Sequence, residues 1–485
     1  MCAMMKGKLI QYACTVVLTI PCFQAAFTFV WPSYAIPALQ SDRSPLGYKI
    51  SEREAGLISS CTMLSPMIVT MFAGTLADVF GRKKISVACG FIILSSWILV
   101  LTAKSASQIL IARLICGLAF GCNIIVVIMY IGELCQTSTR ATATVIITFL
   151  FSIGALASYS LGWVCSYETV CYFCITLSVI YIIFMFALVK ESPVFLVGKG
   201  REKEALHCLA FYRGASVVTE HVLGELSYMR SQHNQNKQNH PIEENVPQYE
   251  TEKLTEEKTS LPQEETSAWK LLFASTSSRR ALISMVSIMV LTVYMGMVSV
   301  QVYAAQLFTK MAPNISPDLC SVILALVLVA SSCVGTFTMD LFKRRSLMIC
   351  STLMSSWCMA VLGSLLRWSW ASDWAVTLVV VIYCFSYQVG PNSLPFVLTS
   401  ETFGPQTRGV ASQVVVTSMF LSNFLLLILF GPVEDQIGLD GTFFLFSIIG
   451  FVTVIFTYFT MKETKGIPLD EIQKMYEKGF LYREK

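Results

Sequence analysis

The chain is dominated by long apolar runs that are separated by short polar connections. A hydrocarbon core of ~30 Å needs about 20 helical residues, and the apolar runs match that length. The first run is longer than a signal-peptide core, so we expect it to be retained. We predict an all-α membrane protein with twelve spans, over residues 9–30, 55–77, 85–103, 108–130, 141–163, 170–189, 280–301, 318–339, 346–366, 374–399, 410–430 and 441–461.

Composition supports a membrane protein. Hydrophobic residues make up 54% of the chain and charged residues 14%, whereas soluble domains carry roughly 25% charged residues. The net charge of +4 comes without a basic stripe of interleaved aromatics, so we expect no nucleic-acid partner. The lipid bilayer is an expected partner, and nothing indicates an obligate protein partner. Most of the seventeen cysteines lie in apolar runs as small buried residues, although Cys165 and Cys171 flank one short loop and could pair.

Basic residues in the short loops predict the orientation. Arg82, Arg140, Arg344 and Arg408 fall in connections that alternate along the chain with loops carrying only scattered charges. Loops rich in Lys and Arg stay in the cytoplasm. We therefore expect both termini to be cytoplasmic and the protein to reside in the plasma membrane.

A three-part charge pattern occurs once in each half of the chain. The first copy has Asp78 and Arg82 around a tight loop, then Glu133 with Arg140, then Glu191. The second copy repeats these parts in order and at nearly the same offset, as Asp340 with Arg344 and Arg345, Glu401 with Arg408, and Glu463. Such recurrence indicates duplication of one unit. Many secondary transporters are built from duplicated halves with the substrate site between them.

The repeat predicts the domain organisation. We expect a six-helix bundle over 1–190, a cytoplasmic connector over 191–278, a second bundle over 279–461 and a cytoplasmic tail over 462–485. Within the connector, apolar spacing predicts short helices over Glu202–Tyr212 and Val217–Met229. The stretch from Ser231 to Ser267 has almost no large apolar residues and is predicted to be disordered.

The charged residues at helix ends predict a gate. Glu133 and Arg140 bracket one turn, and Glu401 and Arg408 bracket the equivalent turn of the other half. We expect acidic and basic groups of the two halves to pair across the cytoplasmic face, each pair worth a few kcal/mol when partly desolvated. Pairs of this kind can hold one of two states, as a rocking transporter requires.

Several motifs then identify a family resemblance. They include GTLADVFGRK over 74–83, Arg113 with Gly117 and Gly121, KESP over 190–193, Gly390-Pro391 with Pro395, and KETKG over 462–466. Together they resemble the sugar porter family of the major facilitator superfamily, most closely its facilitated trehalose transporter-like branch. The resemblance implies the major facilitator fold, with two six-helix bundles, alternating access and no cofactor. It also implies that the charged residues named above form a cytoplasmic network in each half.

The sugar pocket departs from that family pattern. The family's Gln-Gln-x-Ser-Gly-x-Asn run falls on 292–298, where only Gly296 is kept. A span-five glutamine becomes Thr148, and a span-ten glutamate becomes Gln388, while Asn423 is retained. Each buried hydroxyl without a partner costs about 1–3 kcal/mol, so a hexose needs other partners here.

Polar residues inside apolar spans supply candidate partners, because such residues are costly and often functional. The candidate substrate-binding residues are Gln24, Thr148, Thr292, Gln301, Tyr303, Gln388, Asn392 and Asn423. Gly390, Pro391 and Pro395 are expected to break the helix beside them and to let it bend as a gate. No metal-ligand spacing occurs, and no metal is expected.

The first span predicts whether transport is coupled to protons, and it has no Asp, Glu, Lys, Arg or His between Tyr12 and Trp31. We therefore expect a facilitative uniporter of a small neutral solute, with a sugar such as glucose or trehalose as the default. Two alternatives remain: a non-transporting solute receptor or sensor, and a carrier of a less polar non-sugar solute. No nucleophile–base set or phosphate loop favours an enzyme.

Overall fold

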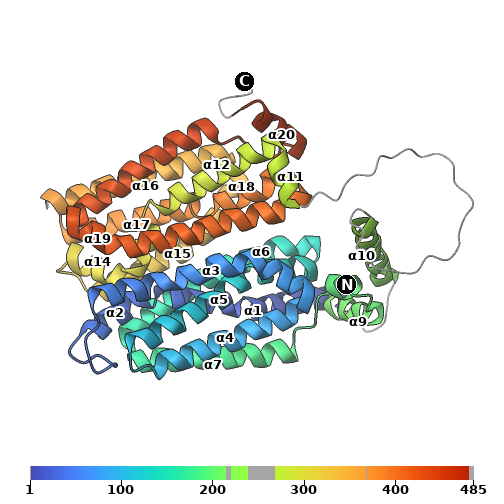
Figure 1. Cartoon of the computed structure of the whole chain (residues 1–485), viewed down its shortest axis with the longest axis horizontal. Coiled ribbons are helices and arrows are strands. Elements are labelled where there is room, and N and C mark those ends of the chain that lie inside the picture. Colours follow the sequence, from blue (N-terminus) through green and yellow to red (C-terminus); the bar gives the residue numbers. More distant parts are fainter. Residues whose placement is uncertain (1, 215–219, 239–267, 369, 480–485) are drawn as a thin grey trace, which may run out of the picture.

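Two helical bundles lie side by side in the computed structural model, which describes residues 2–214, 220–238, 268–368 and 370–479 (Figure 1). The first bundle contains α1 (Cys2–Val30), α2 (Pro32–Gln40), α3 (Glu52–Phe80), α4 (Arg82–Leu101), α5 (Ala106–Leu134), α6 (Thr137–Val164) and α7 (Tyr167–Ala187). The second contains α12 (Thr276–Val293), α13 (Met297–Val302), α14 (Ala304–Met311), α15 (Pro317–Leu341), α16 (Arg344–Trp368), α17 (Asp373–Val389), α18 (Leu394–Thr402) and α19 (Pro405–Thr460).

Eleven helical segments among the described residues are long and apolar enough to cross a membrane. The sequence predicts twelve, and the difference lies in α19, which contains both of the last two predicted spans. Gly438 interrupts α19 with a φ of 78°, a conformation that only glycine adopts without strain. The chain reverses there while its helical hydrogen bonding continues on both sides. The fold is therefore the expected all-α membrane fold of two six-span bundles.

Two spans of the second bundle are broken. Gly296 separates α12 from α13 with a φ of 91°, and an added Cβ would lie 2.3 Å from the Phe446 ring. Between α17 and α18 the helix stops at Val389 and resumes at Leu394, across the expected Gly390-Pro391 break. Proline lacks the N–H that a continuous helix needs, which explains this interruption.

The connector carries α8 (Pro193–Gly198), α9 (Glu202–Tyr212), α10 (Glu220–Gln238) and α11 (Ala268–Ala274). Helix α9 has the predicted bounds. The predicted disorder from Ser231 onward is wrong for its first residues, because α10 continues to Gln238. Glutamine and lysine there are good helix formers, which outweighs the lack of apolar residues. The remainder of that prediction, residues 239–267, lies outside the described residues.

A short helix packs against the connector end of each bundle. Tyr212 of α9 is fully buried, and its carbonyl accepts a 3.0 Å hydrogen bond from the Gln11 side chain of α1. At the same end of the second bundle lies α20 (Leu469–Glu477), whose Gln473 donates to the Thr402 carbonyl at 2.6 Å. Tyr476 of α20 is also fully buried, and burial raises its pKa to about 12. In Figure 1 the N-terminus, α9 and α20 all lie on the side from which the connector leaves the bundles.

The bundles meet along two helix pairs, α3 with α19 and α6 with α15. The Thr70 and Thr417 hydroxyls are 3.3 Å apart at the first of these contacts. At the end of the molecule occupied by α2 and α14, the Tyr159 hydroxyl donates to the Gln301 carbonyl at 2.6 Å. Nearby, the backbone N–H of Ala305 donates to the Ser33 hydroxyl at 3.0 Å. Two of these three hydrogen bonds between the bundles thus lie at the end opposite the connector.

Candidate functional site

The first charge cluster ties together three helix ends. Arg82, at the start of α4, places Nη2 2.8 Å and Nε 3.2 Å from Oε1 of Glu133, at the end of α5. The Ser192 hydroxyl, just after α7, donates to the other carboxylate oxygen of Glu133. Asp78 adds a second carboxylate 2.7 Å from Arg82 Nη2. The Arg82 side chain is only 7% exposed and that of Glu133 16%, so this pair is largely withdrawn from water.

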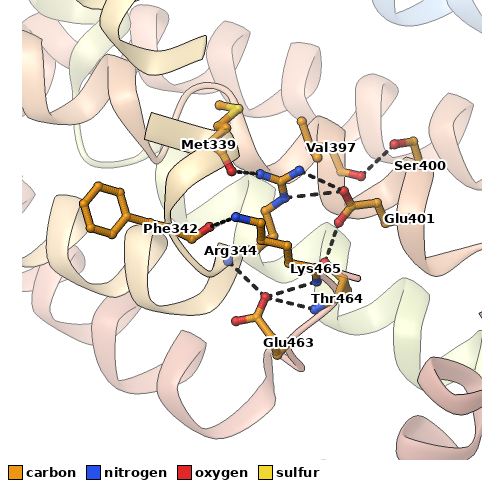
Figure 2. Close-up of polar contacts among 9 residues, drawn as sticks. All are labelled: Met339, Phe342, Arg344, Val397, Ser400, Glu401, Glu463, Thr464 and Lys465. Atoms are coloured by element: carbon orange, nitrogen blue, oxygen red, sulfur yellow. Dashed lines mark hydrogen bonds and ion pairs between the residues drawn. The ribbon is translucent and has the colours of Figure 1, made fainter. Parts of the chain in front are cut away.

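A cluster of the same construction lies in the second bundle (Figure 2). Arg344, at the start of α16, places Nη2 3.2 Å and Nε 3.4 Å from Oε1 of Glu401, in α18. The Thr464 hydroxyl donates to the other oxygen of Glu401, as Ser192 does in the first bundle. Glu463 accepts from the backbone N–H groups of Arg344 and Arg345 at 3.0 and 3.2 Å. We call the face that carries the two clusters the charged face.

The turn before Arg82 depends on glycine. Gly81 has a φ of 100°, and a Cβ added there would lie 2.6 Å from Oε2 of Glu191. The same carboxylate accepts a 3.0 Å hydrogen bond from the backbone N–H of Lys83 through Oε1. The turn thus brings the start of α4 against Glu191, which lies after α7. This contact explains why a glycine precedes Arg82 in the loop motif.

The two clusters differ from the expected gate in one respect. Glu133 and Glu401 were expected to pair across the two bundles, but each pairs with an arginine of its own bundle. Arg408 is exposed and donates from Nε to the Phe403 carbonyl at 3.2 Å, so it closes its own turn. The side chains of Arg140 and Asp340 lie outside the described residues. In this structure Glu133 and Glu401 thus bond within their own bundles. A pair across the bundles that involves Arg140 stays a prediction.

A cavity of about 240 Å³ lies between the bundles. Both bundles contribute to its wall, chiefly through aromatic, methionine and aliphatic side chains. Among the described residues that line it there is no Asp, Glu, Lys, Arg or His. The lining is Cys22, Phe29, Met63, Phe120, Asn123, Ile124, Ile147, Thr148, Phe151, Ser152, Ala155, Met289, Thr292, Val293, Met297, Val298, Gln301, Leu328, Tyr387, Gln388, Pro391, Asn392, Phe396, Met419, Phe420 and Asn423.

Six of the eight candidate binding residues line this cavity: Thr148, Thr292, Gln301, Gln388, Asn392 and Asn423. Gln24 does not line it, because its amide turns into the first bundle and donates to the Cys174 carbonyl at 2.9 Å and to Ser178 Oγ at 2.7 Å. Tyr303 is also directed elsewhere; its hydroxyl donates to the Leu427 carbonyl at 3.3 Å. Both residues are better explained by helix–helix hydrogen bonding than by contact with a solute.

The hydroxyl and amide groups of the cavity differ in their availability. Thr292 donates to the Met289 carbonyl, and Tyr387 to that of Thr292, so these hydroxyls retain only acceptor capacity. By contrast, Oδ1 of Asn423 is buried and has no hydrogen-bond partner. Oδ1 of Asn123, a residue that the sequence did not indicate, is likewise buried and without a hydrogen-bond partner. One signal could have revealed it: a phenylalanine precedes each asparagine by three residues, at Phe120 and Phe420.

Cys165 and Cys171, which could pair by their position around one loop, are both free thiols in the structure. Cys171 is buried in the first bundle's core.

Comparison with known proteins places this geometry in a family. The facilitated trehalose transporter Tret1 of Apis mellifera ligustica is 23% identical over 451 residues, covering 92% of this chain and 84% of the relative. The Bombyx mori protein of the same name is 23% identical over 436 residues, covering 89% and 80%. The structure of the E. coli xylose transporter XylE superposes with a TM-score of 0.75 at 16% identity, covering 96% of this chain and 99% of that one. The family model for sugar (and other) transporters matches residues 13–476, so the chain is an integral membrane protein of the sugar (and other) transporter family.

Proposed function

We propose that this protein is a facilitative uniporter that carries a small neutral, hydroxylated solute, with a sugar such as glucose or trehalose as the first candidate. The observation that carries the proposal is the central cavity, which both bundles line and whose described wall has no ionisable carboxylate, imidazole, amine or guanidinium group. A wall without such groups suits a neutral solute and offers no site for a transported proton. The names of the insect relatives support a sugar as that solute.

The amides of the cavity provide the polar contacts. Gln301, Gln388, Asn392 and Asn423 all line it, and each can both donate and accept hydrogen bonds from hydroxyl groups. Apart from these four amides, Asn123 and a few hydroxyl side chains, the described wall is apolar. This balance supports a solute that presents an apolar face as well as hydroxyls. A less polar non-sugar solute therefore remains the second candidate.

The charge clusters contribute rigidity in this proposal. Each cluster joins three helix ends of one bundle through two carboxylates and an arginine, which is buried in the first cluster and partly buried in the second. A bundle tied in this way moves as one body, so rocking alters the contacts between bundles and leaves those within them intact. The Gly390-Pro391 break lies beside the cavity and lets α18 bend during that motion. The charged face and both termini are cytoplasmic in this proposal, and the membrane is the plasma membrane.

Uptake into proteoliposomes tests the proposal. The purified full chain should equilibrate labelled glucose or trehalose across the membrane without accumulating it above the external concentration. Gln388→Leu and Asn392→Leu variants should raise KM, because each removes an amide from the cavity. A sensor would show no uptake of any solute while still being stabilised thermally by one of them. Accumulation driven by an imposed pH gradient would contradict the uniport mechanism.

A further inference from the structure

Asn123 of α5 and Asn423 of α19 line one cavity from opposite bundles, and the side chains of both are almost completely buried, with 2% and 5% of each residue exposed. Oδ1 of each amide has no hydrogen-bond partner. A buried acceptor without a partner is unfavourable, and more than nine in ten buried polar groups in native proteins are paired. Two such acceptors at the wall of one cavity indicate that a bound molecule supplies the missing donors.

An aromatic contact between the bundles lies beside these amides. Phe120 and Phe420 meet edge to face with their ring centroids 5.7 Å apart, and both line the cavity. Each phenylalanine is three residues before its asparagine on the same helix, so the two side chains share one helix face. Each helix therefore presents one ring and one free amide oxygen to the cavity.

The chain directions place the amides on opposite sides of the aromatic pair. Helix α5 ends at the charged face with Glu133, so Asn123 lies nearer to that face than Phe120 does. Helix α19 begins near the charged face and runs away from it, so Asn423 lies farther from that face than Phe420 does. A solute that reached both amides would extend across the two rings.

We propose that Asn123 is a specificity-determining, substrate-binding residue, and that it and Asn423 accept hydrogen bonds from one neutral hydroxylated solute held against the Phe120–Phe420 pair. This proposal rests on the proposed carrier function and names how its solute is recognised. The first bundle thereby takes part in recognition through its own amide. When the bundles rock, such a solute changes its hydrogen bonds, because each bundle holds it through one amide.

The test is uptake of glucose and trehalose by the full chain in proteoliposomes, with Asn123→Leu and Asn423→Leu compared with the unsubstituted protein. Leucine has nearly the shape of asparagine but no hydrogen-bonding atom. We expect either variant to raise KM about tenfold, because a solute hydroxyl loses its partner. Ser86→Ala is the matched control: it removes another buried, unpartnered oxygen from the first bundle, away from the cavity, and should leave KM unchanged.

Monodeoxy analogues of the transported sugar give the sharper readout. At one position of the sugar, loss of the hydroxyl should raise KM about tenfold in the unsubstituted protein. The same analogue should leave KM unchanged in Asn123→Leu, because that variant already lacks the hydrogen bond to this hydroxyl. If every deoxy analogue loses as much affinity in Asn123→Leu as in the unsubstituted protein, Asn123 does not contact the solute and the inference is wrong. If the unsubstituted protein takes up neither sugar, the proposed sugar transport fails and this inference fails with it.

Discussion

Glu133→Gln tests whether the first charge cluster holds its bundle together. The substitution keeps the size of the side chain and removes its charge, while Arg82 stays buried with 7% of its side chain exposed. Breaking a buried pair by removing one partner costs about 3–5 kcal/mol. Arg82 retains the Asp78 carboxylate at 2.7 Å and the Ala77 carbonyl at 3.1 Å, so we expect a smaller loss here, between about 1 and 3 kcal/mol.

The equivalent substitution in the second bundle sets the scale. Glu401 is 27% exposed and Arg344 13%, and their nitrogen–oxygen distances of 3.2 and 3.4 Å are longer than those in the first bundle. Glu401→Gln should therefore cost less than Glu133→Gln. At about 2–4 °C per kcal/mol, the Glu133→Gln variant should unfold roughly 2–12 °C below the unsubstituted protein.

Thermal unfolding in lipid nanodiscs measures both variants, and a double-variant cycle with Arg82→Leu isolates the pair. Removing both charges should cost less than the sum of the two single losses, because no buried charge is then left without its partner. Additive losses, or a Glu401→Gln variant less stable than Glu133→Gln, would refute the reasoning that burial of the pair determines its contribution.

Three further predictions concern the turn at Gly81, the hydrogen bond of Tyr159 between the bundles, and the wall of the cavity. Gly81→Ala should lower the unfolding temperature more than Gly466→Ala. Both glycines have a positive φ, but only at Gly81 would the new Cβ meet another atom, Oε2 of Glu191 at 2.6 Å. Equal effects would show that this close approach is unimportant. Tyr159→Phe removes the hydrogen bond to the Gln301 carbonyl, worth about 0.5–1.5 kcal/mol, and should speed hydrogen exchange at the end of α13, where Gln301 lies. Unchanged exchange would show that this bond does not stabilise the contact between the bundles. Initial uptake rates should be equal with and without a pH gradient, since no carboxylate or histidine was found among the described residues of the cavity wall, and a gradient-dependent rate would contradict this.

The sequence predicted the fold well, because each span is long enough to read as one apolar run. Even where two spans merge into α19, the polar residues before Gly438 mark the reversal. The helix break was also predictable, since the chemistry of Gly390-Pro391 is local. These features depend on residues that are neighbours in the chain.

The site was less predictable because it depends on which way a side chain faces. Gln24 and Asn423 are both amides in apolar spans, yet one bonds within its bundle and the other lines the cavity. Apolar periodicity cannot distinguish them, because nearly every position of such a helix is apolar. The network of Arg82 and Glu133 was implied only by the family resemblance. Residue spacing alone could not predict this pair, because the packing of α4 against α5 brings together two residues that are far apart in the chain.

The helices docked beneath the bundles have a consequence for how the protein can be assembled. Helix α9 is fastened to the first bundle through Tyr212, and α20 to the second through Gln473. Each half thus has its own docked helix, formed by residues that follow that half in the chain. Cutting the polypeptide between α10 and α11 would remove none of these anchoring contacts, so two separately synthesised pieces could reassemble into a working pair.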